Sequence, residues 1–177
     1  MSHFSSNAAW YLMRATGVVT LVLLTGVLVL GIATHRRWRP GRAPRVVTAG
    51  VHRAISLLAV AFLGVHVLTA VVVPFVAGRS SFAVGLGALS LDLTGALVVS
   101  SLLRARVPVR LWRGIHWLAY LAWPLALAHS FATGTDASAT WLEGIGAVCV
   151  AAVAVSVLWR LSAERDAKHL EPRAATA

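Results

Sequence analysis

Four histidines in two apolar segments are the residues whose type and spacing could do chemistry in this sequence. His52 and His66 stand 14 positions apart in the first segment, and His116 and His129 stand 13 positions apart in the second. At 1.5 Å of rise per residue, either spacing separates two imidazoles on one helix by roughly 20 Å. If the two helices run in the same direction, the histidines therefore meet in two pairs, His52 with His116 and His66 with His129.

Such imidazole pairs are the axial ligands that a six-coordinate haem b iron needs. Two pairs at different depths predict two stacked haem b groups, one on His52 and His116 and the other on His66 and His129. Because this ligation fills both axial positions of each iron, it favours electron transfer over oxygen binding. We therefore expect cofactor ligands in this chain and no side chain that is itself catalytic.

The composition restricts the class of protein that can position these histidines. The chain has 177 residues, of which 58% are hydrophobic and 12% are charged, with a mean hydropathy of +0.78. A soluble domain carries about 25% charged residues, so we predict an all-α, multi-pass membrane protein that folds as one helical bundle. The single cysteine, Cys149, excludes an intrachain disulfide and a cysteine-ligated metal cluster within this chain. The basic residues lie in short turns, so the net charge of +10 indicates membrane topology and not nucleic-acid binding.

Apolar runs of about 20 residues predict five membrane-spanning helices. These helices are expected at about 10–34, 46–76, 82–103, 111–132 and 140–161, so that a transmembrane domain covers 10–161. Residues 1–9 are expected to form a short extracytoplasmic terminus, without the basic start of a cleaved signal peptide. Residues 162–177 are expected to form a charged cytoplasmic tail.

The basic residues also predict the direction of the spans, because arginine and lysine gather on the cytoplasmic side of a membrane. They are frequent in the turns after the first and third spans and in the C-terminal tail, and rare on the opposite side. The N-terminus is therefore expected outside and the C-terminus in the cytoplasm, so the two histidine-bearing spans run in parallel. This orientation makes His52 and His116 the inner pair, and His66 and His129 the outer pair.

The helical phase agrees with this pairing in one span and disagrees in the other. Fourteen residues at 100° each fall about 40° short of four turns, so His52 and His66 share a face. Thirteen residues fall about 140° short, so an ideal helix would not present His116 and His129 together. Pro124 lies between them and predicts a kink or a local rewinding that changes the phase.

The histidine motifs resemble the ferric-reductase-like transmembrane domain that ferric reductases and NADPH oxidases share. The resemblance rests on His52-x13-His66 and His116-x12-His129, covers about residues 10–161, and includes three flanking phrases. These phrases are Trp10-Tyr11-Leu12-Met13-Arg14-Ala15-Thr16-Gly17, Trp112-Arg113-Gly114-Ile115-His116-Trp117-Leu118-Ala119-Tyr120, and Gly134-Thr135-Asp136 after His129. The resemblance implies two bis-histidyl haem b sites and a stand-alone bacterial member in the cell membrane. The chain departs from the family in one respect: its tail after Leu161 is short and has no glycine-rich phosphate loop, so we expect no flavin or NAD(P)H site within it.

The resemblance and the two pairs together predict transmembrane electron transfer. Electrons would enter at the inner haem from a separate donor, either a cytoplasmic flavoprotein reductase or membrane quinol, and would leave from the outer haem to an extracytoplasmic acceptor. In one alternative, the chain is a haem subunit that delivers electrons to a separate extracytoplasmic reductase, as in the methionine-sulfoxide reductase membrane subunit, a relative of the family. A small proton or metal transporter with paired histidines is an alternative from another class, and would need further polar residues in the spans. A haem-free structural subunit would hold no cofactor.

Other residues in the spans have roles that the sequence leaves open. Arg14 could reach the membrane surface with its guanidinium, or could neutralise the propionates of the outer haem. Arg53 and Arg113 could serve the inner haem similarly, although topology already explains them. Asp92 is the one acid in the interior of a span, and could pair with Arg14 or take part in proton handling. Gly17 is expected to permit the close approach of two helices.

Overall fold

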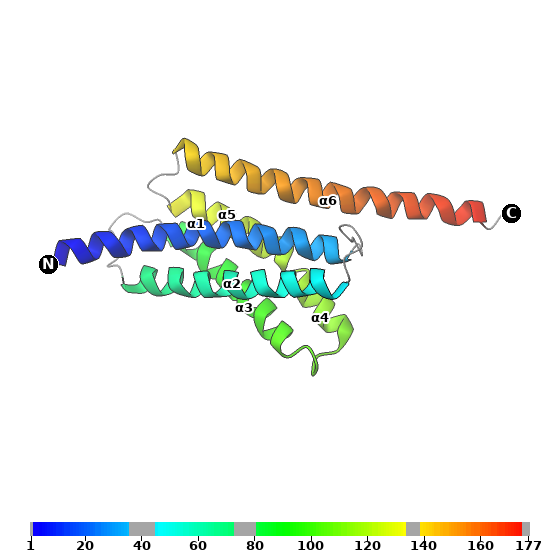
Figure 1. Ribbon diagram of the computed structural model, residues 1–177, viewed down its shortest axis with the longest axis horizontal. Helices are drawn as coiled ribbons and strands as arrows, with labels where there is room; N and C mark the ends of the chain where they lie inside the picture. Colours follow the sequence, from blue (N-terminus) through cyan, green and yellow to red (C-terminus); the bar gives the residue numbers. More distant parts are fainter. Residues whose placement is uncertain (1, 36–44, 73–80, 134–138, 175–177) are drawn as a thin grey trace.

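The computed structural model describes residues 2–35, 45–72, 81–133 and 139–174, and these residues form a bundle of helices. The helices are α1 (Ser2–His35), α2 (Arg45–Val72), α3 (Ser81–Leu102), α4 (Val109–His116), α5 (Ala119–Thr133) and α6 (Thr140–Ala174). No strand occurs within these ranges, so the predicted all-α class is confirmed for them. Figure 1 shows α1 and α2 running antiparallel, with α6 along the upper edge of the bundle.

Four of these helices are long and apolar enough to cross a membrane. Their apolar parts are Ala8–Thr34, Val46–Val71, Phe82–Leu102 and Thr140–Ser162. Each has at least 21 residues, whereas the hydrocarbon core of a bilayer needs about 20. A helix satisfies its backbone N–H and C=O groups within the segment, which is why apolar runs of this length fold as helices in lipid. The described chain thus has the architecture of a multi-pass membrane protein.

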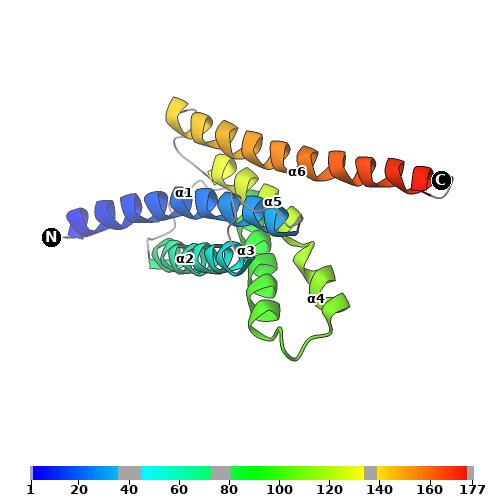
Figure 2. The same ribbon diagram turned by 45° about the vertical axis from the view of Figure 1, so that its right-hand side comes forward.

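The segment predicted as the fourth span, 111–132, forms two helices and not one. α4 ends at His116 and α5 begins at Ala119, and neither of them has the length of the four helices above. The connection from α3 to α4 projects from one side of the bundle (Figure 2). Four of the five predicted spans are thus single helices of spanning length, whereas the fourth is divided between α4 and α5 in the part of the chain that the structure describes.

The break follows from the proline further along this segment. Pro124 lies inside α5, where it cannot donate an N–H to the Tyr120 carbonyl and its ring crowds that carbonyl. The preceding turn tightens, so that Leu118 donates its N–H to the Ile115 carbonyl at 2.9 Å. Tyr120 likewise donates its N–H to the Trp117 carbonyl at 3.1 Å. Three-residue turns of this kind rotate the chain by about 120° per residue instead of 100°. The extra rotation makes up part of the angle by which thirteen residues fail to bring His116 and His129 to the same face.

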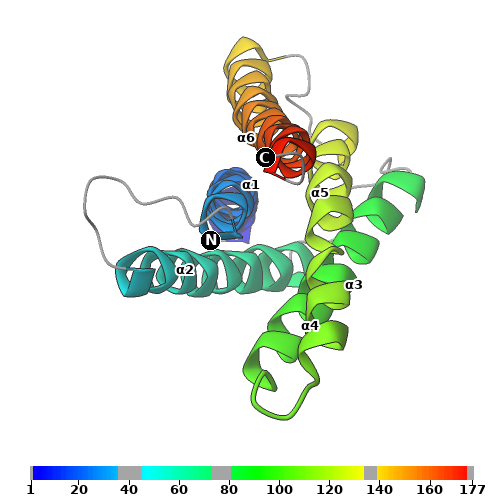
Figure 3. The same cartoon turned by 90° about the vertical axis from the view of Figure 1, so that its right-hand side faces the viewer.

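Helix α1 lies at the centre of the arrangement. It packs against α2, α5 and α6, which surround it in the end-on view of Figure 3. Helix α3 packs against α5 and α4, whereas α2 packs extensively against α1 alone among the described helices. The two histidine-bearing parts of the chain, α2 and the α4–α5 segment, are therefore separated, and side chains extend between them.

A small core holds α5 in position. Its buried residues are Leu28, Ile32, Trp123 and Cys149, from α1, α5 and α6. The Trp123 indole donates its Nε1–H to Thr25 Oγ1 of α1 at 2.8 Å, because a buried indole N–H needs an acceptor. On the other side, Ser90 Oγ of α3 donates to the Ala122 carbonyl at 2.9 Å. These two hydrogen bonds fix α5 between α1 and α3, and thereby fix the position of His129.

Candidate functional site

His66 of α2 and His129 of α5 face each other across the space between their helices. Their ring centroids lie 6.5 Å apart, and their ring planes are inclined by 80°. Two imidazole nitrogens bound to opposite sides of one metal ion, at about 2.0 Å each, would hold their ring centroids about 6 Å apart. The observed separation therefore suits two axial ligands of a single metal ion.

Each of these rings is held by a backbone carbonyl of a neighbouring helix. The His66 Nδ1–H donates to the Met13 carbonyl of α1 at 2.8 Å. The His129 Nδ1–H donates to the Ala83 carbonyl of α3 at 2.8 Å. Because a carbonyl can only accept, each neutral ring carries its proton on Nδ1 and its lone pair on Nε2. Metal-binding histidines are usually oriented in this way, through a hydrogen bond from the second ring nitrogen.

A glycine four residues after each carbonyl makes room for the ring. A Cβ at Gly17 would lie 2.9 Å from Cε1 of His66, and a Cβ at Gly87 would lie 2.5 Å from Cε1 of His129. Real Cβ atoms essentially never approach another heavy atom this closely. Any larger residue at either position would therefore push the imidazole away from its carbonyl.

The same contact is thus built twice, once by α1 with α2 and once by α3 with α5. In each case a carbonyl and a glycine four positions later on one helix hold a histidine of a later helix. From the sequence, Gly17 is expected only as a helix-packing residue and Gly87 has no assigned role. The sequence feature that could have revealed this contact is the equal spacing of Met13–Gly17 and Ala83–Gly87. It is a weak signal, because the carbonyl belongs to the backbone and any residue can supply it.

His52 of α2 and His116 of α4 form the second pair of the predicted arrangement. They lie close enough for a charge on one ring to act on the other. The Nδ1 atoms of both rings are buried and have no hydrogen-bond partner among the described residues. His52 also lies against a glycine of α1, since a Cβ at Gly31 would be 3.6 Å from its Cε1. Neither Nδ1 makes the full carbonyl hydrogen bond that holds each ring of the first pair. The backbone of Val27, four residues before Gly31, nevertheless acts on His52, so the relation of Met13 and Gly17 to His66 recurs there in a looser form.

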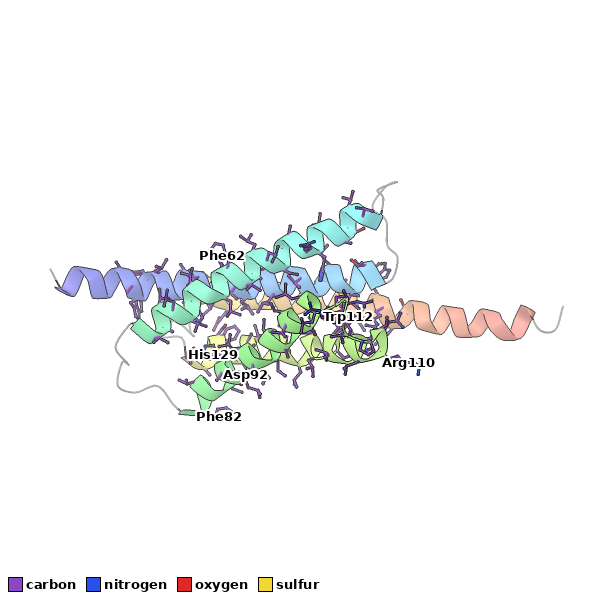
Figure 4. All side chains as sticks on the ribbon, turned by 90° about the horizontal axis from the view of Figure 1, so that it is seen from below. Phe62, Phe82, Asp92, Arg110, Trp112 and His129 are labelled. Carbon is purple, nitrogen blue, oxygen red and sulfur yellow. The ribbon has the colours of Figure 1, made fainter. Side chains whose placement is uncertain are left out.

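Trp112 adds a further buried polar atom beside His116. Its ring centroid lies 4.1 Å from that of His116, and its Nε1 is the remaining buried side-chain nitrogen without a partner among the described residues. The guanidinium of Arg104 lies 4.6 Å from the centroid of the Trp112 ring. Figure 4 places Trp112 and His129 toward opposite ends of the bundle. Three buried side-chain nitrogens at the Trp112 end thus have no hydrogen-bond partner among the described residues, although buried polar groups are normally satisfied.

Arg160 of α6 contacts the turn that joins α4 to α5. Its Nη1 donates to the Tyr120 hydroxyl at 2.6 Å, and its guanidinium lies 4.6 Å from the centroid of the Trp117 ring. Trp117 and Tyr120 belong to the tightened turn that directly follows His116, and their ring centroids are 5.1 Å apart. Arg160 therefore stabilises the turn that sets the phase of His116. Sequence reasoning explains this arginine by topology alone, because its partners lie 40 or more positions away.

The three arginines expected near the cofactors are placed differently from one another. Arg14 lies near the start of α1, with its guanidinium 4.5 Å from the centroid of the Trp10 ring. It follows Met13 in the chain and thus lies at the same end of the bundle as His66. Arg53 and Arg113 are exposed, and in the described ranges no contact joins either of them to a histidine ring.

Each of the two donor sets consists of a pair of imidazoles. Within the described ranges, no three side chains of His, Cys, Asp or Glu gather closely enough to hold a metal ion. A pair of imidazoles is sufficient for a haem iron, because the porphyrin supplies the four equatorial nitrogens. An apolar groove of about 460 Å³ lies between α2 and α3, and neither His66 nor His129 lines it. Its walls include Leu63, Val67, Leu91 and Val98.

Replacing Arg160 with leucine should loosen the turn between α4 and α5. The substitution removes a hydrogen bond to Tyr120 and a cation–π contact with Trp117, each of which contributes about 1 kcal/mol. We expect faster amide hydrogen exchange at 118–122 and a lower midpoint of thermal unfolding in detergent. Arg106→Leu, at an exposed position, is the matched control. Equal exchange at 118–122 in the two variants would show that Arg160 does not stabilise the turn.

Comparison of the chain with protein-family models, with curated proteins and with solved structures finds no match. The interpretation of the two histidine pairs therefore depends on their own geometry. That geometry consists of the ring separation in the His66–His129 pair, the two carbonyl hydrogen bonds, the glycines that admit the rings, and the unsatisfied nitrogens beside His116.

Proposed function

We propose that this protein carries electrons across a membrane through two haem b groups, each held by a pair of histidines. His66 and His129 would hold the outer haem, and His52 and His116 the inner one. The proposal is carried by the His66–His129 pair, whose ring centroids are 6.5 Å apart and whose Nδ1 atoms both donate to backbone carbonyls. This arrangement leaves the lone pair of each ring on Nε2, the nitrogen with which an axial histidine binds iron.

The residues of the chain would orient the ligands and shield the site. Haem b, when bound, supplies an iron that takes up and releases one electron. The carbonyls of Met13 and Ala83 raise the basicity of the two outer imidazoles through the Nδ1–H bonds. The helices that carry the outer pair and its neighbours are apolar, which suits the porphyrin macrocycle. His116 has no such carbonyl partner, and His52 has only a looser contact with the Val27 backbone, so we expect the two haem sites to differ in reduction potential.

The membrane topology forms part of the same proposal. Helices α4 and α5 would together make the fourth passage, which gives five passages, with the N-terminus outside and the C-terminus in the cytoplasm. The arginines of the α3–α4 region support a cytoplasmic position for this end of the bundle. They are Arg104, Arg106, Arg110 and Arg113. The membrane would be the cell membrane of a bacterium.

We place the electron donor and the acceptor on other molecules. A cytoplasmic flavoprotein reductase or membrane quinol would reduce the inner haem, and an extracytoplasmic acceptor would oxidise the outer one. The acceptor could be a ferric chelate or a separate reductase subunit, since both lie on the side that the outer pair would face. A proton or metal transporter is less well supported, because the groove between α2 and α3 has almost entirely apolar walls.

Haem content and optical spectra test the proposal. We expect the protein, expressed with sufficient haem and purified in detergent, to contain two low-spin b haems per chain. His66→Ala or His129→Ala should each remove the outer haem, and His52→Ala or His116→Ala the inner one, because a single imidazole binds far more weakly than a pair. Pyridine haemochrome assays and reduced-minus-oxidised spectra provide the count. Haem content that is equal in the parent and in all four variants would contradict the assignment, and a haem-free protein would favour the transporter or structural reading.

Gly87→Ala should impair the outer haem site selectively, because the new methyl group would displace the His129 ring from the Ala83 carbonyl. Gly17→Ala should have the same effect on His66, to a smaller extent because the contact is longer. We expect loss or weakened retention of one haem, with the second haem unchanged. Gly85→Ala is the matched control on the same helix, since a Cβ at that position would meet nothing within 4 Å. Unchanged haem content and potentials in Gly87→Ala would refute the role given to this glycine.

A further inference from the structure

Trp112 has a buried indole N–H that donates to no residue in the part of the chain that the structure describes. It lies one helical turn before His116 on α4, so the two side chains share a face of that helix. Their ring centroids are 4.1 Å apart. The indole of Trp123, by contrast, donates its Nε1–H to Thr25 Oγ1. Because a buried indole N–H normally has an acceptor, the Trp112 N–H is suited to hold a ligand beside His116.

Arg104 adds a positive charge at the same place. Its guanidinium lies 4.6 Å from the centroid of the Trp112 ring, and it is close enough to His116 for its charge to act on that ring. Its side chain is exposed, so it borders the buried indole from the surface of the bundle. A guanidinium and an indole N–H are both donors and cannot accept a hydrogen bond. Together they therefore favour an anionic acceptor.

The surrounding stretch of chain contains no such acceptor among its side chains. Between Asp92 and Asp136 the sequence has no aspartate or glutamate, and both Arg104 and Trp112 lie in this interval. Asp92 itself is ten residues before the end of α3 at Leu102, which corresponds to about 15 Å along the helix. The anion that these two donors would bind thus belongs to another part of the molecule or to a bound group.

We propose that Trp112 and Arg104 bind a propionate carboxylate of the inner haem. This inference rests on the proposed function, in which His52 and His116 hold that haem. The carboxylate would accept a hydrogen bond from the Trp112 Nε1–H and a charge-assisted one from the Arg104 guanidinium. Such partners matter there because an uncompensated carboxylate is costly in surroundings of low dielectric.

The proposal moves the propionate contact away from the arginines that the sequence suggests. Arg53 and Arg113 are exposed and touch neither histidine of the inner pair among the described residues, whereas Arg104 and Trp112 are joined to His116 by the contacts above. Figure 4 shows Trp112 at the same end of the bundle as Arg110. This is the end that we propose to face the cytoplasm, where a propionate can reach polar surroundings while the porphyrin stays among apolar helices.

The rate at which the full chain releases haem to excess apomyoglobin in detergent tests this contact. Trp112→Phe keeps a ring against His116 but removes the N–H, and Arg104→Gln removes the charge. Each should release the inner haem about tenfold faster, as expected for the loss of one hydrogen bond to a charged group. Arg106→Gln, at an exposed position two residues further along, is the matched control and should leave the rate unchanged.

The reduction potential of the inner haem provides a second readout. Trp112→Phe and Arg104→Gln should both lower it, because a less compensated carboxylate favours the ferric state. Arg104→Lys, which retains the charge, should restore most of the parent potential. The inner haem is identified in the redox titration as the component that His52→Ala removes.

Reconstitution of the haem-free chain with the dimethyl ester of haem b separates a carboxylate contact from an effect on His116 alone. Both propionates are neutral in the ester, so the carboxylate charge that Arg104 and Trp112 would recognise is gone. The parent, Trp112→Phe and Arg104→Gln should therefore release the ester at equal rates.

Three results would overturn the proposal in a chain that binds two haems. The first is an unchanged release rate and potential in both variants. The second is faster release of the ester by the variants, which would mean that Trp112 and Arg104 only position His116. The third is an effect present in nanodiscs that contain anionic lipid and absent in phosphatidylcholine nanodiscs, which would assign the anion to a lipid headgroup. A parent chain that binds no haem would instead refute the proposed function, on which this inference rests.

Discussion

The hydrogen bond from a histidine Nδ1 to a carbonyl of the neighbouring helix is the interaction on which the rest of the arrangement depends. An imidazole N–H in an apolar interior needs an acceptor, and the carbonyls of Met13 and Ala83 provide one for each ring of the outer pair. The ring can approach the backbone this closely because a glycine follows four residues later. This constraint pairs α1 with α2 and α3 with α5, and leaves the two imidazoles facing each other between the pairs.

A second constraint acts on the fourth histidine-bearing segment. The thirteen-residue spacing between His116 and His129 does not fit a regular α-helix. A tightened turn joins α4 to α5 between these two residues. Pro124 favours this turn by denying the Tyr120 carbonyl its usual partner, and Arg160 of α6 stabilises it from outside. Helix α6 carries no histidine of either pair, but through Arg160 it determines how His116 is presented. The sixth helix is thus linked to the site by one side chain.

The sequence is sufficient for the properties that depend on composition and spacing. The all-α class and the four long apolar helices follow from hydropathy, and the pairing of His66 with His129 follows from the positions of the four histidines. The division of 111–132 into two helices does not follow, because a hydropathy run continues through the break and the effect of Pro124 appears a full turn earlier. The roles of Gly87 and Arg160 also could not be predicted from the sequence, since each depends on a partner in another helix. The expected pairing of Asp92 with Arg14 rests on depth alone, and no ion pair joins the two side chains among the described residues.

The central claim is that His66 and His129 are the two axial ligands of one haem iron. Electron paramagnetic resonance of the oxidised, purified protein tests it most directly, because the anisotropy of a low-spin ferric haem depends on the angle between its two imidazole planes. With ring planes inclined by 80°, the account predicts a highly anisotropic low-spin signal that disappears in His66→Ala and persists in His52→Ala. The absence of any low-spin ferric signal after expression with sufficient haem, or a signal that His66→Ala leaves unchanged, would contradict the account.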